Sequence, residues 1–381
     1  MTVLKDYLDT RHYTEQLCKH LQPEDYTPQS ACFASPPKWH IAHTTWFFEE
    51  MILKVYVPGY TVFDASFGYL FNSYYNSLGE RIKRENRGLI TRPNHKRIFE
   101  YRAHVDAKIV SLLNEEVSDK ILKMIVLGIN HEQQHQELLL TDLKYTFSHN
   151  PTYPKFWETT LVEQDNEAPG WIPIEAGIYA IGHDSKAFCY DNELSKHRVF
   201  LEPFEISEHL VSNASYMDFI NDGGYENPAY WLDQGWQWIQ QENIKKPLYW
   251  KGIKGSWHQY TLSGLKPLDP KHPIAHVSFY EAAAFAQWAG YRLPTEFEWE
   301  VASHQLQWGK RWEWTNSAYL PYPNFKIAEG AAGEYNGKFM INQMVLRGAS
   351  TATSKNHSRP TYRNFFPAET QWQVTGIRLA K

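Results

Sequence analysis

The sequence predicts two domains of different class, an α-helical bundle followed by an irregular α+β domain. Apolar residues recur at helical spacing four times within the first 150 of the 381 residues. Asn-Pro, Tyr-Pro and Ala-Pro-Gly then interrupt the helical pattern between 151 and 169. The rest of the chain consists of short alternating segments separated by Gly, Asn and Trp clusters. We therefore expect domains at 1–150 and 171–381, joined by a linker at 151–170.

The first domain is expected to be an up-and-down bundle of four helices. The helical segments are Lys5–Leu21, Lys38–Tyr56, Asn94–Leu113 and Asp119–Phe147. Between the second and third lies Pro58–Pro93, a stretch rich in Gly, Asn, Tyr and Arg that is too long for an ordinary turn. Loops of this length inside a compact domain are usually functional. We therefore expect this loop to be functional.

The second domain shows weaker periodicity. Gly177–Gly182 and His197–Ile206 alternate in polarity, as β-strands do, and only Ser278–Ala289 has a clear helical pattern. Aromatic residues make up 15% of the chain, which agrees with an aromatic-rich core or with an aromatic-lined pocket. We expect aromatic packing, rather than regular layers, to hold this domain together.

Composition disfavours several classes of protein. The formal net charge is −5 with no long run of either sign, which argues against a nucleic-acid or anionic-membrane surface. No stretch approaches the roughly 18 uninterrupted apolar residues of a membrane span. The N-terminal residues lack the apolar core of a secretory signal, and the three cysteines, Cys18, Cys32 and Cys189, form no CxxC pair. We therefore expect a cytoplasmic protein with no nucleic-acid or membrane partner.

The strongest chemical signal is the pair His131 and His135 in the fourth helical segment. Histidines four residues apart share a helix face, so both imidazoles can reach one metal ion, although such pairs also occur on helices that bind none. The residues HEQQH also satisfy the HExxH motif of zinc proteases, in which Glu132 would act as general base. No histidine follows at the spacing that this motif requires, and Glu137 and Asp142 come too early. The protease interpretation is therefore disfavoured.

A better third ligand lies in the second helical segment, within Trp39-His40-Ile41-Ala42-His43. Facing helices of a bundle project side chains into a shared interior, so one histidine of this segment can meet the two of the fourth. Helical phase does not decide between His40 and His43. Three neutral imidazoles, with other positions open to water, substrate or dioxygen, suit zinc and ferrous iron equally well.

These motifs resemble a known combination of domains. WHIAHTTWFFEE together with HEQQHQELLLTDLKYTF is similar to DinB-like helical bundles. The second half resembles the formylglycine-generating-enzyme, or sulfatase-modifying-factor, fold, which is related to C-type lectins. The segments that carry this second resemblance are Asp191–Ser207, Phe219–Tyr225, His272–Glu300, Trp312–Tyr319 and Val345–Ser350. The order of both modules, which covers nearly the whole chain, resembles the ergothioneine-type sulfoxide synthases, the hercynine oxygenases.

The resemblance implies an iron enzyme. The family's ligands match His43, His131 and His135, which leaves His40 a secondary role. They imply a mononuclear non-haem Fe(II) that binds a thiol through sulfur and activates O2. The implied reaction joins this sulfur to the imidazole C2 of hercynine, the Nα-trimethylated histidine, and oxidises the sulfur to a sulfoxide. The chain is thus expected to be an oxidoreductase of ergothioneine biosynthesis that needs no organic cofactor.

Two further matches concern hercynine. Gln134, inside the HExxH motif, and Asn364, near the C-terminus, match family residues that contact this substrate, which implies that the C-terminal segment reaches the bundle. Without the resemblance, Gln134 would be interpreted as a helix-surface glutamine, because its side chain points about 100° away from that of the adjacent His135. A trimethylammonium group donates no hydrogen bond and favours aromatic faces. Phe365, Phe366 and Trp372 are candidates, although packing is the more common role for such residues.

The long loop resembles the branch of the family that uses free cysteine. Tyr74 and Tyr75 match paired tyrosines of that branch, which line the iron site, where a phenol can donate a proton or an electron. Phe366 stands where the branch that uses γ-glutamylcysteine has an acidic residue. An arginine of this loop is expected to pair bidentately with the substrate carboxylate. We favour Arg87 over Arg84, because the adjacent glycine lets the backbone turn; a surface role is the alternative for either.

One departure from the resemblance concerns the second domain. Formylglycine-generating enzymes oxidise a substrate cysteine with a cysteine pair near their C-terminus, but no cysteine follows Cys189 here. Thiol–copper chemistry in this half is therefore excluded. We expect the domain to act as a scaffold and as one wall of the pocket, and its Asp and Asn oxygens could hold a structural Ca2+.

Three alternatives stay open at this point. The same fold can serve another donor or acceptor, such as γ-glutamylcysteine, a selenosugar in selenoneine synthesis, or histidine in ovothiol synthesis. The second alternative is a zinc-dependent hydrolase or thiol transferase of the DinB type. The third is a binding protein whose lectin-like half carries the function.

Overall fold

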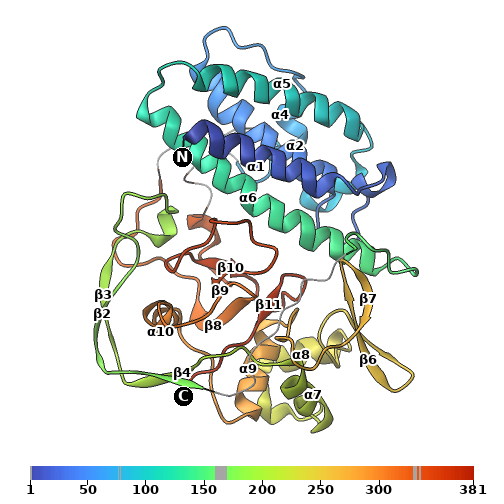
Figure 1. Ribbon diagram of the computed structural model, residues 1–381, viewed down its shortest axis with the longest axis vertical. Coiled ribbons are helices and arrows are strands. Elements are labelled where there is room, and N and C mark those ends of the chain that lie inside the picture. Colours follow the sequence, from blue (N-terminus) through green and yellow to red (C-terminus); the bar gives the residue numbers. More distant parts are fainter. Residues whose placement is uncertain (1, 76, 78, 159–169, 329–332, 334–335) are drawn as a thin grey trace. The chain divides into compact units, whose positions relative to one another are not determined.

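The chain forms two compact units in a computed structural model that describes residues 2–75, 77, 79–158, 170–328, 333 and 336–381. The helical unit comprises residues 1–158 together with 352–357, and the mixed unit comprises 159–351 together with 358–381 (Figure 1). A short segment from late in the chain therefore belongs to the N-terminal unit. The expected order, a helical domain followed by an α+β domain, is confirmed.

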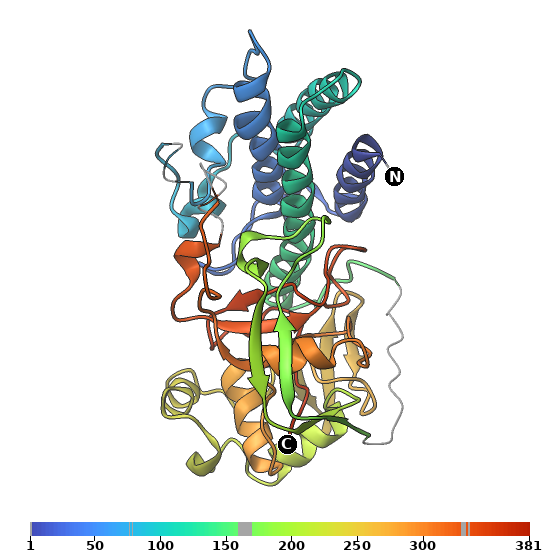
Figure 2. The same cartoon turned by 90° about the vertical axis from the view of Figure 1, so that its left-hand side faces the viewer.

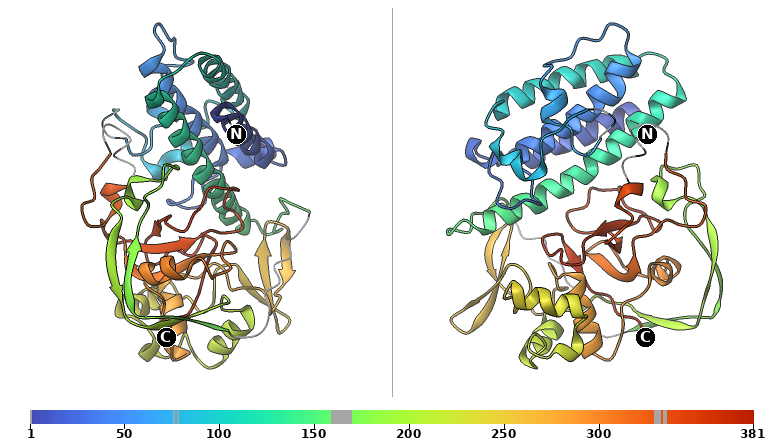
Figure 3. Two further views of the ribbon diagram at one scale, coloured as in Figure 1. Left: turned by 60° about the vertical axis from the view of Figure 1, so that its left-hand side comes forward. Right: turned by 180° about the vertical axis from the view of Figure 1, so that it is seen from behind.

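Four helices frame the helical unit, as predicted. They are α1 (Val3–Cys18), α2 (Pro37–Phe48), α5 (His95–Leu113) and α6 (Asp119–Ser148). The long α6 packs against both α1 and α2, and α2 also packs against α5 (Figures 1 and 3). The shorter elements of the unit are η1 (Pro23–Tyr26), the π-helix η2 (Glu49–Leu53), α3 (Lys54–Tyr56), α4 (Phe67–Leu70) and η4 (Arg84–Leu89).

The central helix of this unit is α2. All twelve of its residues are buried, so it has no solvated face and its polar side chains, His40 and His43 among them, lie inside the unit. Gly128 of α6 allows the two helices to approach closely, because a Cβ at that position would lie only 2.5 Å from the Phe48 ring. This close approach brings the histidines of α2 and α6 within reach of one another.

The long loop between α3 and α5 is anchored on α2 and its continuation. Trp46 donates from Nε1 to the carbonyl of Gly68 at 3.1 Å. Glu49 accepts from the Tyr60 hydroxyl at 2.6 Å and from the backbone N–H of Phe63 at 3.1 Å. Because these anchors are buried or half-buried, the loop has a defined course beside α2, where it can contribute side chains to a site.

The mixed unit is built from several small sheets, as its weak periodicity predicted. Its four-stranded sheet has the order β10-β9-β8-β11, with β11 parallel to β8 and the other neighbours antiparallel. Separate antiparallel sheets join β5-β6-β7, β1-β4 and β2-β3. Figure 2 shows β2 and β3 as two green strands side by side. The strands are Trp171–Ile174 (β1), Gly177–Ile181 (β2), His197–Leu201 (β3), Phe204–Ser207 (β4), Trp250–Ile253 (β5), Ser256–Thr261 (β6), Gly264–Pro267 (β7), Trp312–Ala318 (β8), Met344–Gly348 (β9), Asn364–Phe366 (β10) and Thr375–Gly376 (β11).

Helices are more frequent in the mixed unit than the sequence indicated. They are α7 (Asn213–Asn221), α8 (Asp233–Gln241), α9 (Phe279–Trp288) and α10 (Glu296–Ala302), with single turns at Asp191–Glu193 (η5), Pro228–Tyr230 (η6) and Gly337–Phe339 (η8). The expectation of one clear helix, α9, was wrong because α7, α8 and α10 are too short for periodicity to stand out. The predicted strand His197–Ile206 is likewise two strands, β3 and β4.

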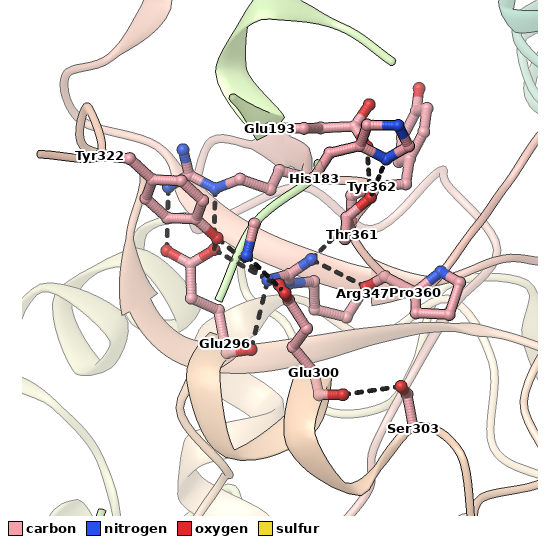
Figure 4. Close-up of polar contacts among 12 residues, drawn as sticks. His183, Glu193, Glu296, Glu300, Ser303, Tyr322, Arg347, Pro360, Thr361 and Tyr362 are labelled. Carbon is pink, nitrogen blue, oxygen red and sulfur yellow. Dashed lines mark hydrogen bonds and ion pairs between the residues drawn. The ribbon is translucent and has the colours of Figure 1, made fainter. Parts of the chain in front are cut away.

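Buried ion pairs tie the mixed unit together. Glu296, at the start of α10, accepts from Arg363 through both carboxylate oxygens, at 2.8 and 2.9 Å. Arg347 of β9 donates to Glu300 of the same helix and to the carbonyl of Tyr362 (Figure 4). All five residues are at most 7% exposed. Buried charges that find such partners hold the surrounding segments in one arrangement, because removal of either partner leaves a desolvated charge.

Some of the sequence expectations fall outside what the structure describes. The predicted linker at 151–170 includes 159–169, which lie outside the described residues, so the domain bounds stay predictions. None of the helices among the described residues is both long enough and apolar enough to cross a bilayer. All three cysteines are free thiols, and the cytoplasmic location stays a prediction.

Candidate metal centre

Three histidines from two helices converge inside the helical unit. His43 comes from α2, while His131 and His135 lie one turn apart on α6. One ring nitrogen of each lies within 4.8 Å of the others, and the three ring centroids are 4.7 to 4.9 Å apart. His43 and His131 are fully buried, and His135 is partly exposed. The structure thus brings together the three residues predicted as metal ligands.

Hydrogen bonding leaves one nitrogen of His43 available. Its Nδ1–H donates to the carbonyl of Phe71, in the long loop, at 2.7 Å. Its Nε2 is buried and has no hydrogen-bond partner among the described residues. A buried nitrogen lone pair without a donor is costly unless a ligand occupies it, and an imidazole that donates from its other nitrogen to a carbonyl is the usual arrangement of a metal ligand. The site therefore fits a metal ion.

His40, the histidine that helical phase did not distinguish from His43, lies between His135 and Asp142. Its Nδ1 lies 2.9 Å from Nδ1 of His135, and its Nε2 lies 3.1 Å from Oδ2 of Asp142. His40 and Asp142 are 3% and 1% exposed. No pattern in the sequence indicated the Asp142 contact, because it depends on the packing of α2 against α6.

The pKa values of the clustered histidines favour the neutral form that metals require. Burial lowers the pKa of His131 to about 3. Burial, together with the neighbouring imidazoles, lowers the pKa of His43 and His135 well below the usual range. At neutral pH all three imidazoles are therefore uncharged and keep a lone pair for a metal.

Glu132, the carboxylate of the HExxH motif, is engaged elsewhere. It accepts from Arg11 at 2.8 Å, from Arg102 at 2.6 Å and from the Thr14 hydroxyl at 2.6 Å, and it is fully buried. Burial alone would raise the pKa of Glu132, but the two guanidinium groups lower it to about 2. A carboxylate held in this way joins α1, α5 and α6 and has little basicity left for the general-base role of a zinc protease.

Aromatic rings link the predicted tyrosines to the metal ligands. The ring of Tyr75, fully buried, lies 4.8 Å from that of Tyr74 and 5.5 Å from that of Trp46, which in turn stacks on His43 at 5.5 Å. Asn72 fixes the backbone here, since its amide exchanges hydrogen bonds with the N–H and the carbonyl of Tyr75 at 3.3 and 3.1 Å. This turn holds the tyrosine pair beside α2.

The two candidate arginines have different environments. Arg87 is 6% exposed and donates to the hydroxyls of Ser35 and Ser73 at 2.9 and 3.0 Å. Its guanidinium lies 3.3 Å above the ring of Trp39, and the same ring stacks on His43 at 4.5 Å.

No carboxylate pairs with Arg87 within the described part of the chain, and its buried Nε lacks a hydrogen-bond partner there. Burial, followed by the charge of Arg84, lowers the pKa of Arg87. Arg84 itself is exposed and donates to the carbonyl of Phe33. The buried, incompletely paired Arg87 is thus the better candidate of the two for binding an anion.

The remaining predicted residues lie in both units. Gln134 is half-buried on α6, next to His135. Asn364, Phe365 and Phe366 form β10 of the mixed unit, where Phe365 stacks on Tyr319 at 4.0 Å. Their roles in binding a substrate stay predictions. Among the described residues, the group of three side chains that could hold a metal ion is the histidine cluster. These residues therefore give no support to the expected calcium ion.

A segment that sequence reasoning missed packs on α6, the helix that carries His131 and His135. Residues 352–357 belong to the helical unit, where Thr353 donates to Glu137 at 2.8 Å and Ser354 donates to the side chain of Gln136. His357 lies 3.1 Å from the side-chain oxygen of Gln133. No local pattern could have revealed these contacts, because the partners are more than 200 residues apart in sequence.

Comparisons with known proteins agree with both halves of this structure. Residues 7–139 match the family model of the DinB superfamily, and residues 158–311 match that of the sulfatase-modifying factor enzyme 1-like domain. The chain is 25% identical to the hercynine oxygenase of Mycobacterium tuberculosis, over an alignment that covers 97% of each protein. The chain is a homologue of hercynine oxygenases.

Two other relatives mark how far this similarity extends. The hercynine oxygenase of Mycolicibacterium smegmatis is 27% identical over 74% of this chain and 76% of that protein. The formylglycine-generating enzyme of Bos taurus is 31% identical, but over only 38% of this chain and 42% of that protein. The similarity to hercynine oxygenases therefore includes the helical unit, in which the three histidines lie.

Proposed function

We propose that this chain is an oxygen-dependent oxidoreductase of ergothioneine biosynthesis that joins the sulfur of cysteine to the imidazole C2 of hercynine and oxidises that sulfur to a sulfoxide. The observation that carries the proposal is the cluster of His43, His131 and His135 in a chain that is similar to one hercynine oxygenase over 97% of its length. The names of those relatives support an oxygenase that acts on hercynine. The tyrosine pair in the long loop supports cysteine as the donor.

The proposed reaction balances with one dioxygen per turnover. The S–H bond of cysteine and the C2–H bond of hercynine break, and one C–S bond and one S–O bond form. Four electrons leave the two substrates and reduce O2, so that one oxygen atom enters the sulfoxide and the other leaves as water with the two protons. No further reductant is required.

The three imidazoles would hold ferrous iron. When bound, this ion supplies the binding and activation of the thiol and of dioxygen. The chain presents neutral nitrogen donors for it, with the orientation of His43 fixed by the Phe71 carbonyl. Three imidazoles occupy only part of the coordination sphere of iron and leave positions for substrates.

Arg87 is the proposed binding site for the carboxylate of the thiol substrate. A buried guanidinium without a counter-charge is costly, and a carboxylate would provide that charge through bidentate hydrogen bonds. Because the Trp39 ring contacts both Arg87 and His43, a carboxylate bound there would lie close to the metal site. The exposed Arg84 would add positive charge nearby.

The tyrosine pair is the proposed source of a proton or an electron during turnover. Tyr75 is buried and in ring contact with Trp46, which stacks on His43. Tyr74, half-buried, lies at the more accessible side of the pair.

Gln134 of α6 is proposed to contact hercynine. For the β10 residues Asn364, Phe365 and Phe366 the family resemblance supports the same substrate, with the two phenylalanines offering aromatic faces to its trimethylammonium group. Such a cation has no hydrogen to donate and is attracted to the negative face of an aromatic ring. The support for these four assignments is the family resemblance of the segments that contain them.

A zinc hydrolase is the rival of a different class, and Glu132 argues against it. Hydrolysis at an HExxH site needs this carboxylate as a base beside a metal-bound water. Glu132 instead makes ion pairs with Arg11 and Arg102. The charged hydrogen bonds of two arginines stabilise its anionic form and reduce its basicity.

Oxygen uptake with defined substrates tests the proposal. The chain would be purified without oxygen, loaded with Fe(II) and mixed with hercynine and cysteine in air-saturated buffer, with mass spectrometry of the product. We expect consumption of one O2 per product and a product mass that equals both substrates plus one oxygen less two hydrogens. The His135→Ala variant serves as the matched control and should consume no oxygen. Activity with zinc and none with iron would contradict the proposal.

The same assay, run with a panel of donors, decides the sulfur source. Cysteine should support faster turnover than γ-glutamylcysteine or a selenosugar, and hercynine should be preferred to histidine as the acceptor. A higher kcat/KM for γ-glutamylcysteine would keep the reaction type and replace the proposed donor.

A further inference from the structure

We infer that Asp142 and His40 form a relay that orients His135 and selects Nε2 as its metal-binding atom. The inference rests on the proposed function only in taking the three histidines as metal ligands. The relay is a line of two contacts, from Oδ2 of Asp142 to Nε2 of His40 at 3.1 Å and from Nδ1 of His40 to Nδ1 of His135 at 2.9 Å. Both distances are those of ordinary hydrogen bonds.

The position of each proton follows from the acceptor at one end of the line. A carboxylate only accepts, so Nε2 of His40 carries a hydrogen and donates it to Asp142. A neutral imidazole has one donor and one acceptor, so Nδ1 of His40 accepts. His135 must then donate from its own Nδ1. This leaves the lone pair of His135 on Nε2, the nitrogen that points away from the relay.

The relay also connects the two helices that supply the ligands. Asp142 and His135 are both on α6, two turns apart, and His40 reaches between them from α2. The backbone N–H of Ser35, just before α2, donates to the same Oδ2 of Asp142 at 2.8 Å. Asp142 therefore holds the start of α2 and, through His40, the ring of a ligand on its own helix.

His43 has a simpler partner for the same purpose. Its Nδ1 donates to a backbone carbonyl, that of Phe71, which provides a neutral acceptor. His135 has instead an acceptor connected to a buried carboxylate. A carboxylate that accepts from a metal-bound imidazole, directly or through a second ring, increases the electron donation of that ligand. His40 and Asp142 are thus positioning residues, and they give His135 a stronger donor character than His43.

Metal binding measured without any substrate tests the relay. The probe is Co(II), which takes nitrogen ligands and reports its coordination through its visible absorption spectrum. We expect His40→Leu, which removes both contacts, to weaken Co(II) binding by about 10- to 100-fold. His40→Asn places an amide oxygen near the position of Nδ1 and should recover most of this loss. Asp142→Asn keeps the shape and removes the charge, so it should shift the visible bands with a smaller loss of affinity.

Controls separate the relay from a packing role. Thr44→Val changes another buried residue of α2, whose hydroxyl donates to the carbonyl of Ile41 at 3.2 Å, and should leave the affinity unchanged. Thermal unfolding of each metal-free variant shows whether it is folded. A folded His40→Leu variant with wild-type affinity would overturn the inference. Equal losses in His40→Asn and His40→Leu would overturn it too, in favour of packing.

The outcome is also distinguishable from a failure of the proposed function. If the unaltered chain bound no Co(II), the metal site itself, and the relay with it, would be wrong. If the variants followed the expected order while hercynine and cysteine gave no sulfoxide, the relay would stand and the proposed reaction would fall.

Discussion

Buried arginines are treated differently in two regions of the molecule. Around α10 of the mixed unit two buried guanidinium groups pair with carboxylates, Arg363 with Glu296 and Arg347 with Glu300. Arg87, beside α2, is equally buried but meets two hydroxyls and the ring of Trp39. The loss of one partner from a charge pair that is complete within the protein destabilises the fold, whereas a buried charge without a counter-charge is available to a ligand.

The same difference separates neighbouring residues of one motif. Glu132 has partners on α1 and α5 for both of its oxygens. His131 and His135, on the adjacent stripe of the same helix, join His43 in the histidine cluster. One face of α6 thus holds the bundle together, and the next face presents the histidine cluster. An HExxH match alone does not show this division, which depends on what packs against each face.

The largest effect on stability is expected when the ion pair between Glu296 and Arg363 is broken. Glu296→Gln puts an amide nitrogen against the guanidinium of Arg363, which leaves that charge buried without a counter-charge. We expect the free energy of unfolding of the mixed unit to fall by about 3–5 kcal/mol, measured by urea denaturation. Co(II) affinity of the folded variant is the control and should not change. A variant as stable as the unaltered chain would show that this pair contributes no net stability.

The opposite effect on stability is expected at Arg87, whose charge is not paired with a carboxylate among the described residues. Arg87→Met removes a buried charge that has no carboxylate partner among the described residues, so stability should stay the same or increase. The KM for cysteine should rise by about 10- to 100-fold, which corresponds to the loss of a charged hydrogen bond of about 1.5–3 kcal/mol. Arg84→Met, at an exposed position, is the matched control with a smaller rise. Loss of stability with an unchanged KM would assign Arg87 to the fold.

Part of this fold could be read from the sequence. Helical periodicity over long segments predicted α1, α2, α5 and α6, and i, i+4 spacing placed His131 and His135 on one face. Those signals are local, so they survive without knowledge of the fold. In the mixed unit the short α10 was missed, although Thr295 and Glu298 form a capping box that the sequence displays.

The rest of the site depends on packing between distant segments. His40 and His43 lie three residues apart on one buried helix, and only the position of α6 places His43 in the histidine cluster and His40 beside Asp142. Likewise, Arg87 and Arg84 differ because only the first is covered by Trp39 and the loop. Family resemblance selected His43, which the structure places beside His131 and His135, whereas residue pattern alone left the two histidines equivalent.

The smallest expected effect concerns the segment 352–357, where a complete hydrogen bond can be made incomplete without changing a charge. Ser354→Ala leaves the side-chain oxygen of Gln136 without this donor, and Gln136 also donates to Thr14, which holds Glu132. We expect the free energy of unfolding to fall by about 1 kcal/mol and amide hydrogen exchange in α6 to become faster. Co(II) affinity should fall by less than about tenfold. Ser358→Ala, which removes a similar bond within the mixed unit, should leave exchange in α6 unchanged. If both variants gave the same hydrogen exchange in α6, the segment 352–357 would contribute nothing to the stability of that helix. The helix would then be held by contacts within the bundle alone.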